Sequence, residues 1–206
     1  MVTSDEIDRK IREVSEALPE EDKKIFRPFL CQGSPVDCEV FLIGHNPGVV
    51  TFFWDFWDKK KGCDREGLLN QYIHYNNRLG PTRRKIQILV EVLKPYNVLD
   101  TNIFHIYSKE LSKLPKDRRD SSICDYLIAN IKPKLIVVHG AEAIRHLSGL
   151  SKESLSRDTL TSVKLFGATT YVYSGCHLAR HYSYARVEEI GKELKKFCGK
   201  HNLKRS

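Results

Sequence analysis

The strongest constraint on the fold is a series of short apolar runs that alternate with amphipathic helical patterns. Strands are predicted from the runs CEVFLIG (38–44), NVLDTNIFHI (97–106) and KLIVVHG (134–140). A later stretch, 162–175, fits either a hairpin or one further strand. Near-continuous apolar strands separated by helices indicate an α/β sandwich with a largely parallel central sheet.

The helical patterns between these runs have apolar faces and caps. Ser4 is positioned to cap a first helix with acids in its first turn, and Thr82 to cap another. Further helices are predicted near 65–78, in the segment that ends before Pro133, in AEAIRHLSGL and in YARVEEIGKELKKFC.

The sequence indicates a single domain. Its 206 residues are enough to bury a sizeable core, and no repeat, low-complexity segment or linker divides them. We expect a single domain over 1–206, with a helical segment at 1–30 and a basic tail at 199–206.

The charge is positive and unevenly distributed. The formal net charge is +8, but residues 1–25 carry eight acids and five bases, so the rest of the chain holds +11. A basic body favours a polyanionic partner, most often nucleic acid, although solubility alone explains it equally well. No apolar stretch approaches the roughly 20 residues of a membrane helix, and the N-terminus does not resemble a signal peptide. We expect a monomer, cytoplasmic and nucleoid-associated, or nuclear in a eukaryote, with no membrane partner.

The six cysteines include no CxxC pair, so we expect free thiols in a reducing compartment. Cys31, Cys38 and Cys63 are candidate ligands of a cluster, but their spacing fits neither a ferredoxin nor a zinc finger. The sequence therefore predicts no cofactor and no metal.

Polar residues follow the predicted strands, and in such sheets ligands bind beyond the carboxyl ends of the strands. These residues are His45, Asn46, Asn102, His105, His139, Cys176 and His177. In the loop GHNPG, Gly44 and Gly48 permit tight turns and Pro47 stiffens the backbone. The side chain of Asn46 either holds a water near an electrophile or caps its own loop.

Three other features admit two interpretations each. The aromatic run TFFWDFWD (51–58) would stack on a nucleobase or form a core patch. Asn102 would read the edge of a base or bond to backbone. The segment YSGCHLARHYSYA (173–185) is either a basic helix start or a site. There His177 would donate to an oxygen that gains charge and Arg180 would contact phosphate. His177 and His181 would alternatively share a metal with acids such as Asp55, as in a hydrolase.

Taken together, these motifs resemble the uracil-DNA glycosylase superfamily. GHNPG (44–48) is similar to the G-x-N-P-G first motif of some branches, and TNIF to the strand that carries a base-reading asparagine. IKPKLIVVHGAEAIRHL resembles the family's strand–glycine–helix segment. At the second motif, typically H-P-S-P, this chain reads His177-Leu178-Ala179-Arg180, which lacks the proline and the serine. The resemblance covers residues 37–195.

The resemblance implies a three-layer α/β/α fold with a short, mostly parallel sheet, and hydrolysis of the N-glycosidic bond of uracil or a related deaminated base flipped out of DNA. The implied catalytic residues are Asn46, which would position water, and His177, which would stabilise the leaving base. Residues implied to line the base pocket are Gly44, His45, Pro47, Gly48, Phe53 and Asn102. Residues implied to contact DNA are Arg180, His181, Arg83 and Arg84. The alternative is a non-catalytic nucleic-acid-binding protein on the same fold.

Overall fold

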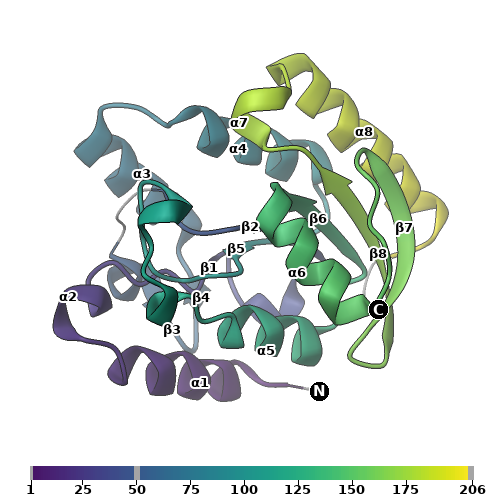
Figure 1. Cartoon of the computed structure of the whole chain (residues 1–206). Coiled ribbons are helices and arrows are strands. Elements are labelled where there is room, and N and C mark those ends of the chain that lie inside the picture. The colour runs from purple at the N-terminus through teal and green to yellow at the C-terminus, as the bar shows by residue number, and fades with distance from the viewer. Residues whose placement is uncertain (1, 49–51, 204–206) are drawn as a thin grey trace.

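The computed structural model describes residues 2–48 and 52–203, which form an α/β fold around one six-stranded sheet (Figure 1). The strand order is β1-β5-β2-β6-β8-β7. The bounds of these strands are β1 Phe29–Leu30, β2 Val40–Gly44, β5 Val98–Asn102, β6 Leu135–His139, β7 Thr159–Leu165 and β8 Ala168–Gly175. A separate two-stranded ribbon is formed by β3 Trp57–Asp58 and β4 Gly62–Cys63.

The helices alternate with the strands along the chain. The α-helices are α1 Ser4–Glu16, α2 Glu20–Lys23, α3 Arg65–Asn76, α4 Pro81–Leu93, α5 Ser122–Ile131, α6 Ala141–Ser151, α7 Leu178–His181 and α8 Tyr184–Lys200. The 3₁₀-helices are η1 Pro35–Asp37, η2 Phe53–Phe56, η3 Leu111–Lys113 and η4 Lys116–Arg118.

The sheet is mixed but mostly parallel. Strands β5, β2, β6 and β8 run in one direction, while the edge strands β1 and β7 pair antiparallel to β5 and β8. The predicted α/β class with a largely parallel sheet is therefore confirmed. Because the four central strands are parallel, their carboxyl ends lie at the same edge of the sheet.

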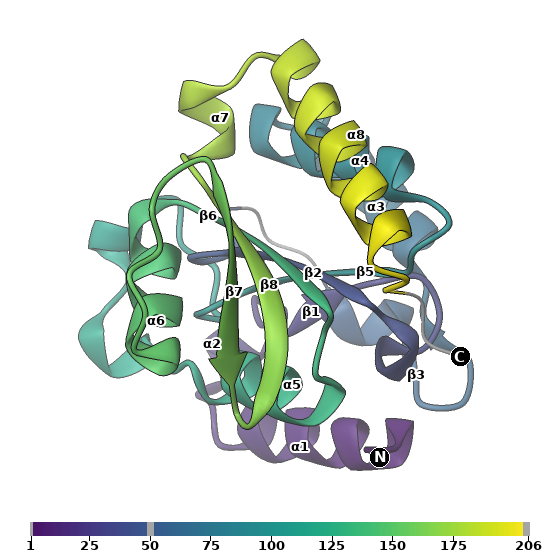
Figure 2. The ribbon, with the colours of Figure 1, turned by 90° about the vertical axis from the view of Figure 1, so that its right-hand side faces the viewer.

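Helices flank the sheet on both faces. In Figure 2, α4 and α8 lie on one side, and α1, α5 and α6 on the other. Alternate residues of β2 explain this: Val40 and Leu42 pack into the cluster under α4 and α8, while Phe41 and Ile43 pack into the cluster with α1, α5 and α6. Strand β2, which has a helical layer on each face, is thus apolar along its whole length.

Two predicted helix caps are wrong by one or two residues. Thr3, not Ser4, caps α1, and it forms a capping box with Glu6. Helix α4 begins at Pro81 after Gly80, so Thr82 lies inside it. Proline fits the first helical position because that position needs no N–H.

The ends of the chain also differ in detail from the prediction. The segment 1–30, expected to be helical, ends in the edge strand β1, which at two residues is too short to give a sequence pattern. The 162–175 stretch is a hairpin that begins at Thr159 and turns at Phe166 and Gly167, both with positive φ. Of the predicted tail, the first two residues complete α8, and 204–206 lie outside the described residues.

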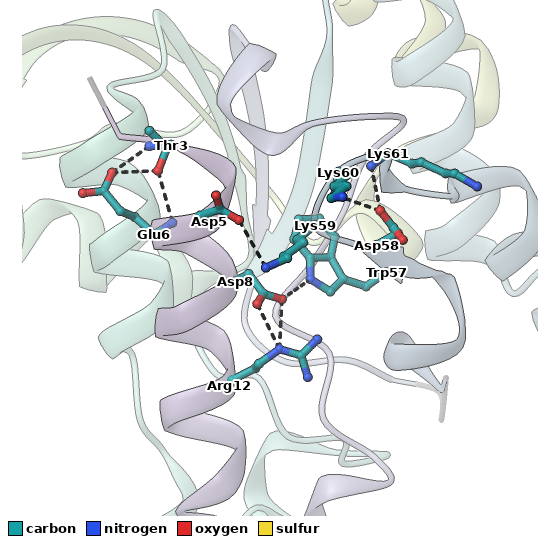
Figure 3. A network of polar contacts seen from close by, with 10 residues as sticks. All are labelled: Thr3, Asp5, Glu6, Asp8, Arg12, Trp57, Asp58, Lys59, Lys60 and Lys61. Carbon is teal, nitrogen blue, oxygen red and sulfur yellow. Dashed lines mark hydrogen bonds and ion pairs between the residues drawn. The ribbon is translucent and has the colours of Figure 1, made fainter.

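Helix α1 is fixed to the β3–β4 ribbon by a polar network (Figure 3). The indole nitrogen of Trp57 donates to Asp8 Oδ1 at 2.7 Å, and Arg12 donates to the same carboxylate. The Arg12 guanidinium also lies 4.8 Å from the ring centroid of Trp54. Within residues 2–48 and 52–203, no helix is long and apolar enough to span a membrane.

Candidate functional site

A cavity of about 320 Å³ opens at the edge where the parallel strands β2, β5 and β6 end and the loop after β8 begins. Its lining combines main-chain turns, histidines, amides and charged groups. The lining residues are Arg27, His45, Asn46, Gly48, Tyr72, Gly80, Pro81, Thr82, Arg83, Ile86, Asp100, Asn102, Ser108, Lys109, His139, His177 and Arg180. The strand-end residues His45, Asn46, Asn102, His139 and His177 are therefore brought together, as the parallel sheet predicts.

Gly44 ends β2 at a point where side chains of two neighbouring strands approach its backbone. A Cβ atom at this position would lie 2.8 Å from the amide of Asn102 and 3.0 Å from Cε1 of His139. Glycine is needed here because no side chain would fit between them. Gly44 was predicted to line the base pocket, but it is not among the lining residues; its lack of a side chain instead lets Asn102 and His139 close over the strand end.

Asn46 is buried, at 8% exposure, and its amide nitrogen is fully engaged. Nδ2 donates to the backbone oxygens of Pro47 at 3.0 Å and Ser108 at 2.7 Å. Its Oδ1 is buried and has no partner among the described residues. A buried acceptor without a donor is costly, by about 1–3 kcal/mol, so the site is suited to a ligand or water that donates. The nitrogen end of the amide therefore caps its own loop, as one interpretation of the sequence expects, and the oxygen end remains available to a donor.

Three histidines meet at the cavity. The ring centroid of His177 lies 5.8 Å from that of His45 and 6.3 Å from that of His139. Burial lowers the pKa of all three histidines more than any neighbouring charge does, and it lowers the pKa of His139 to about 3. These rings are neutral near pH 7, so each offers one N–H donor and one acceptor.

The loop that follows β6 depends on Gly140. Its φ of +90° lies in the region that favours glycine. A Cβ there would lie 3.5 Å from His45 Nδ1 and 4.0 Å from His177 Cδ2. The turn at Gly140 therefore leaves space beside the two rings.

A buried charged network forms the floor of the cavity. Arg83 of α4 forms an ion pair with Asp100 of β5, and both side chains are more than nine-tenths buried. Arg27 lies just before β1 at 5% exposure, and its backbone nitrogen donates to the oxygen of His105 at 2.8 Å. Arginine charges hold the pKa of Asp100 below its ordinary value, against the effect of burial.

Lys85 fixes the segment that carries His177. Its buried Nζ donates to the backbone oxygens of Leu178 at 2.8 Å and Tyr182 at 2.5 Å, and so joins α4 to α7, which lie side by side in Figure 1. The hydroxyl of Tyr182 in turn accepts from the backbone nitrogen of Cys176 at 2.7 Å. Both ends of the His177 segment are therefore held to the body of the protein.

The cavity continues into a second depression of about 520 Å³. His45, Lys109, His177 and Arg180 line both. Lys109 and Arg180 are exposed, so they place positive charge at the boundary between the two. His181 lines only the second depression.

Several predicted site residues lie elsewhere. Phe53 is 1% exposed and packs against Phe29 and Trp57 in the core beside α1, so it does not line the cavity. The aromatic residue at the cavity is Tyr72 of α3. Arg84 is exposed, and its Nε donates to the oxygen of Leu79 outside the cavity.

Arg83 and Pro47 are placed differently from their predicted roles. Arg83 was predicted to contact DNA, but it is buried in the cavity floor. Pro47 is buried behind the cavity, where its oxygen accepts from Asn46 and from the backbone nitrogen of Ser108. Gly48 lies at the cavity wall. His105 is buried against Phe26 and does not line the cavity.

The metal alternative gains no geometric support. Asp55 lines a separate depression that contains neither His177 nor His181. Burial raises the pKa of the Cys31 thiol, and the adjacent thiols of Cys38 and Cys63 raise it further. Over the described ranges, no group of three or more histidine, cysteine, aspartate or glutamate side chains is arranged to hold a metal ion.

The sequence patterns did not identify Arg27, Tyr72 and Asp100 as residues of the site. Asp100 had a signal, because it is the only charged residue within the apolar run VLDTNIF. A buried acid requires a partner, which predicts a nearby arginine or lysine. Arg27 and Tyr72 lie in segments without a motif, and only the tertiary structure brings them to the strand ends.

No protein-family model matches this chain, and no curated protein matches its sequence.

Proposed function

We propose that the protein is a DNA base-excision glycosylase that hydrolyses the N-glycosidic bond of uracil or a related deaminated base. The observation that carries the proposal is the convergence of Asn46, Asn102 and His177 on one cavity, with Oδ1 of Asn46 buried and unpaired. At about 320 Å³, this cavity is within the range of roughly 300–1,000 Å³ typical of small-molecule sites.

Asn46 would orient the attacking water. Its Nδ2 is held by two carbonyl oxygens, so the orientation of the amide is fixed and Oδ1 faces away from them as an acceptor. A neutral amide oxygen positions a water but removes a proton weakly. The chemistry therefore depends mainly on stabilising the departing base.

Stabilisation of the departing base would come from His177 and Asn102. Cleavage develops positive charge on the sugar and negative charge on the base, and hydrogen bonds to charged groups are stronger than neutral ones. The neutral ring of His177 supplies an N–H donor, and Asn102 would bond the edge of the base. Tyr72 replaces Phe53 as the aromatic residue proposed to lie near the base.

DNA would reach the cavity through the exposed cations at its mouth. A base inside a duplex is inaccessible, so such enzymes flip it out or act on single strands. Lys109 and Arg180 are positioned to contact the phosphates that flank the flipped nucleotide.

The fold supports the proposal at a coarser level. A mostly parallel sheet with helices on both faces accords with the three-layer uracil-DNA glycosylase-like architecture proposed for this chain. Because one fold hosts many activities, the proposal depends on the site rather than on this agreement.

The test uses labelled oligonucleotides that contain one uracil, hypoxanthine or xanthine, each single-stranded and paired. We expect alkali-sensitive abasic sites with at least one of them. Asn46→Ala is expected to lower the single-turnover rate at least about a hundredfold, the loss typical when a reactant is no longer held in position. Asn130→Ala is the matched control, because Asn130 is exposed on α5 and bonds one backbone oxygen.

The second candidate is a non-catalytic nucleic-acid-binding protein. The exposed cations at the cavity mouth and the second motif without proline and serine favour it. It predicts binding to DNA that weakens with salt while no abasic site forms on any substrate. That pair of results would replace the glycosylase proposal.

A further inference from the structure

The amide of Asn102 lies between two groups that together allow it only one orientation. In that orientation, Oδ1 accepts from Nη2 of Arg27 at 2.8 Å, and Nδ2 donates to the backbone oxygen of Asn46 at 3.3 Å. The contact with Asn102 is the one side-chain hydrogen bond of Arg27 found among residues 2–48 and 52–203. Asn102 is itself 5% exposed, so water does not easily take the place of either partner.

The orientation is fixed because neither partner can reverse its role. A guanidinium group has five N–H donors and no acceptor, and a backbone carbonyl only accepts. Rotation of the amide by 180° would place its NH₂ against the N–H of Arg27 and its oxygen against the oxygen of Asn46. Burial lowers the pKa of Arg27 to about 10, so at neutral pH the group stays charged and remains a donor.

The backbone of Arg27 is held independently of Asn102. Its backbone nitrogen donates to His105, and the nearby carboxylate of Asp100 is occupied by Arg83. The acceptor that the Arg27 side chain contacts is Oδ1 of Asn102. A ligand that enters the cavity thus meets an amide whose donor and acceptor ends are already assigned.

We propose that Arg27 determines the base specificity of this site by holding the Asn102 amide in one orientation. This inference rests on the proposed function. Deaminated bases present a ring carbonyl beside a ring N–H, whereas cytosine and adenine present an amino group beside a ring nitrogen that accepts. The two patterns are reversed, so an amide that cannot rotate pairs with one of them and opposes the other. Arg27 is a positioning residue, and the class it selects is the keto-bearing, deaminated base.

The experiment compares single-turnover excision of uracil and cytosine from the same single strand by the wild type, Arg27→Gln and Arg27→Lys. Glutamine can present either end of its own amide, so it no longer fixes Asn102. Lysine donates only, so it keeps the constraint despite its different shape. We expect Arg27→Gln to lower the uracil-to-cytosine rate ratio at least tenfold, about 1.4 kcal/mol. Arg27→Lys is expected to keep the ratio even where both rates fall.

Arg186→Gln on α8 is the matched control, because Arg186 is exposed and bonds to Glu189 and Glu193 away from the cavity. A merely structural role for Arg27 would lower both rates together, so an unchanged ratio in a folded Arg27→Gln would overturn the inference. If Arg27→Gln does not fold, the wild type provides the test, because excision of cytosine as fast as uracil would also overturn the inference. No excision of any deaminated base by the wild type would instead overturn the proposed function.

Discussion

The amide nitrogen of Asn46 donates to the backbone oxygen of Ser108 at 2.7 Å, and this bond joins the loops after β2 and β5 across 62 positions. The same nitrogen donates to the oxygen of Pro47. Since both neighbours are acceptors, only a donor is tolerated on this side of residue 46. The loop therefore depends on the amide that would also hold the water.

Replacing Asn46 with aspartate is expected to destabilise the protein, although a carboxylate is the stronger activator of water. The ionised side chain would face two carbonyl oxygens without a proton, at a cost of about 1–3 kcal/mol. The folded state would then raise the pKa of Asp at position 46, so the loss is largest at neutral pH and shrinks as the pH falls below that raised pKa. Urea unfolding at pH 7 and pH 5 measures it. Equal stability of variant and wild type at pH 7 would contradict the expectation.

Lys85→Met is expected to release the His177 segment. The substitution keeps the apolar stem but removes a charged donor from the oxygens of Leu178 and Tyr182, which costs about 1.5–3 kcal/mol for bonds to a charged group. We expect lower stability together with slower excision. The control is Lys195→Met, at an exposed lysine of α8. A folded Lys85→Met with an unchanged rate would show that the anchor does not position His177.

Gly44→Ala is expected to separate Asn102 from His139. The new Cβ would lie 2.8 Å from the amide, so the side chains must move, at a cost of about 1–3 kcal/mol for overpacking. Gly149→Ala on α6 meets no atom within 4 Å and is the matched control. It should be neutral or stabilising by about 0.5–1 kcal/mol, because alanine favours helix. Thermal unfolding of the two variants measures both changes in stability.

Stability is expected to fall as the pH is lowered from 6.5 towards 4. Burial lowers the pKa of His139 to about 3 and of His105 to about 4, below the ordinary 6.5 of the unfolded chain. In this window the unfolded state binds more protons, so each histidine contributes up to about 1.4 kcal/mol per pH unit. His139→Gln should reduce the slope by one such contribution, whereas His74→Gln, at an exposed position, should not. An unchanged slope in His139→Gln would contradict the burial argument.

Arg180→Gln is expected to weaken DNA binding and its dependence on salt. Each phosphate contact contributes roughly 0.7 to the slope of log affinity against log salt on single strands, and roughly 0.9 on duplex. Loss of one contact should reduce the slope by that amount. Arg84→Gln tests the predicted contact outside the cavity in the same titration. If the slope changes with Arg84 and not with Arg180, the DNA path does not cross the cavity mouth.

The strand ends could be predicted from the sequence because apolar runs and their polar exits are local patterns. Parallel pairing then brings Asn46, Asn102 and His177 to one edge without further information. Phe53 could not be placed in this way, since an aromatic run does not reveal which neighbour will cover it. Its partners Phe29 and Trp57 pack beside α1, and Arg27 reaches the floor through a two-residue edge strand. Long-range packing, which leaves no periodic pattern in the sequence, determines the positions of both Phe53 and Arg27.

The attachment of α1 has a spectroscopic consequence. The chain has two tryptophans, and Trp54 and Trp57 both contact side chains of α1, through Arg12 and Asp8. Intrinsic tryptophan emission will therefore report on the docking of the N-terminal helix, at the opposite side of the sheet from α4 and α8. Occupancy of the cavity will change it little, because neither indole lines that space. A ligand titration followed by fluorescence needs a probe on the oligonucleotide instead.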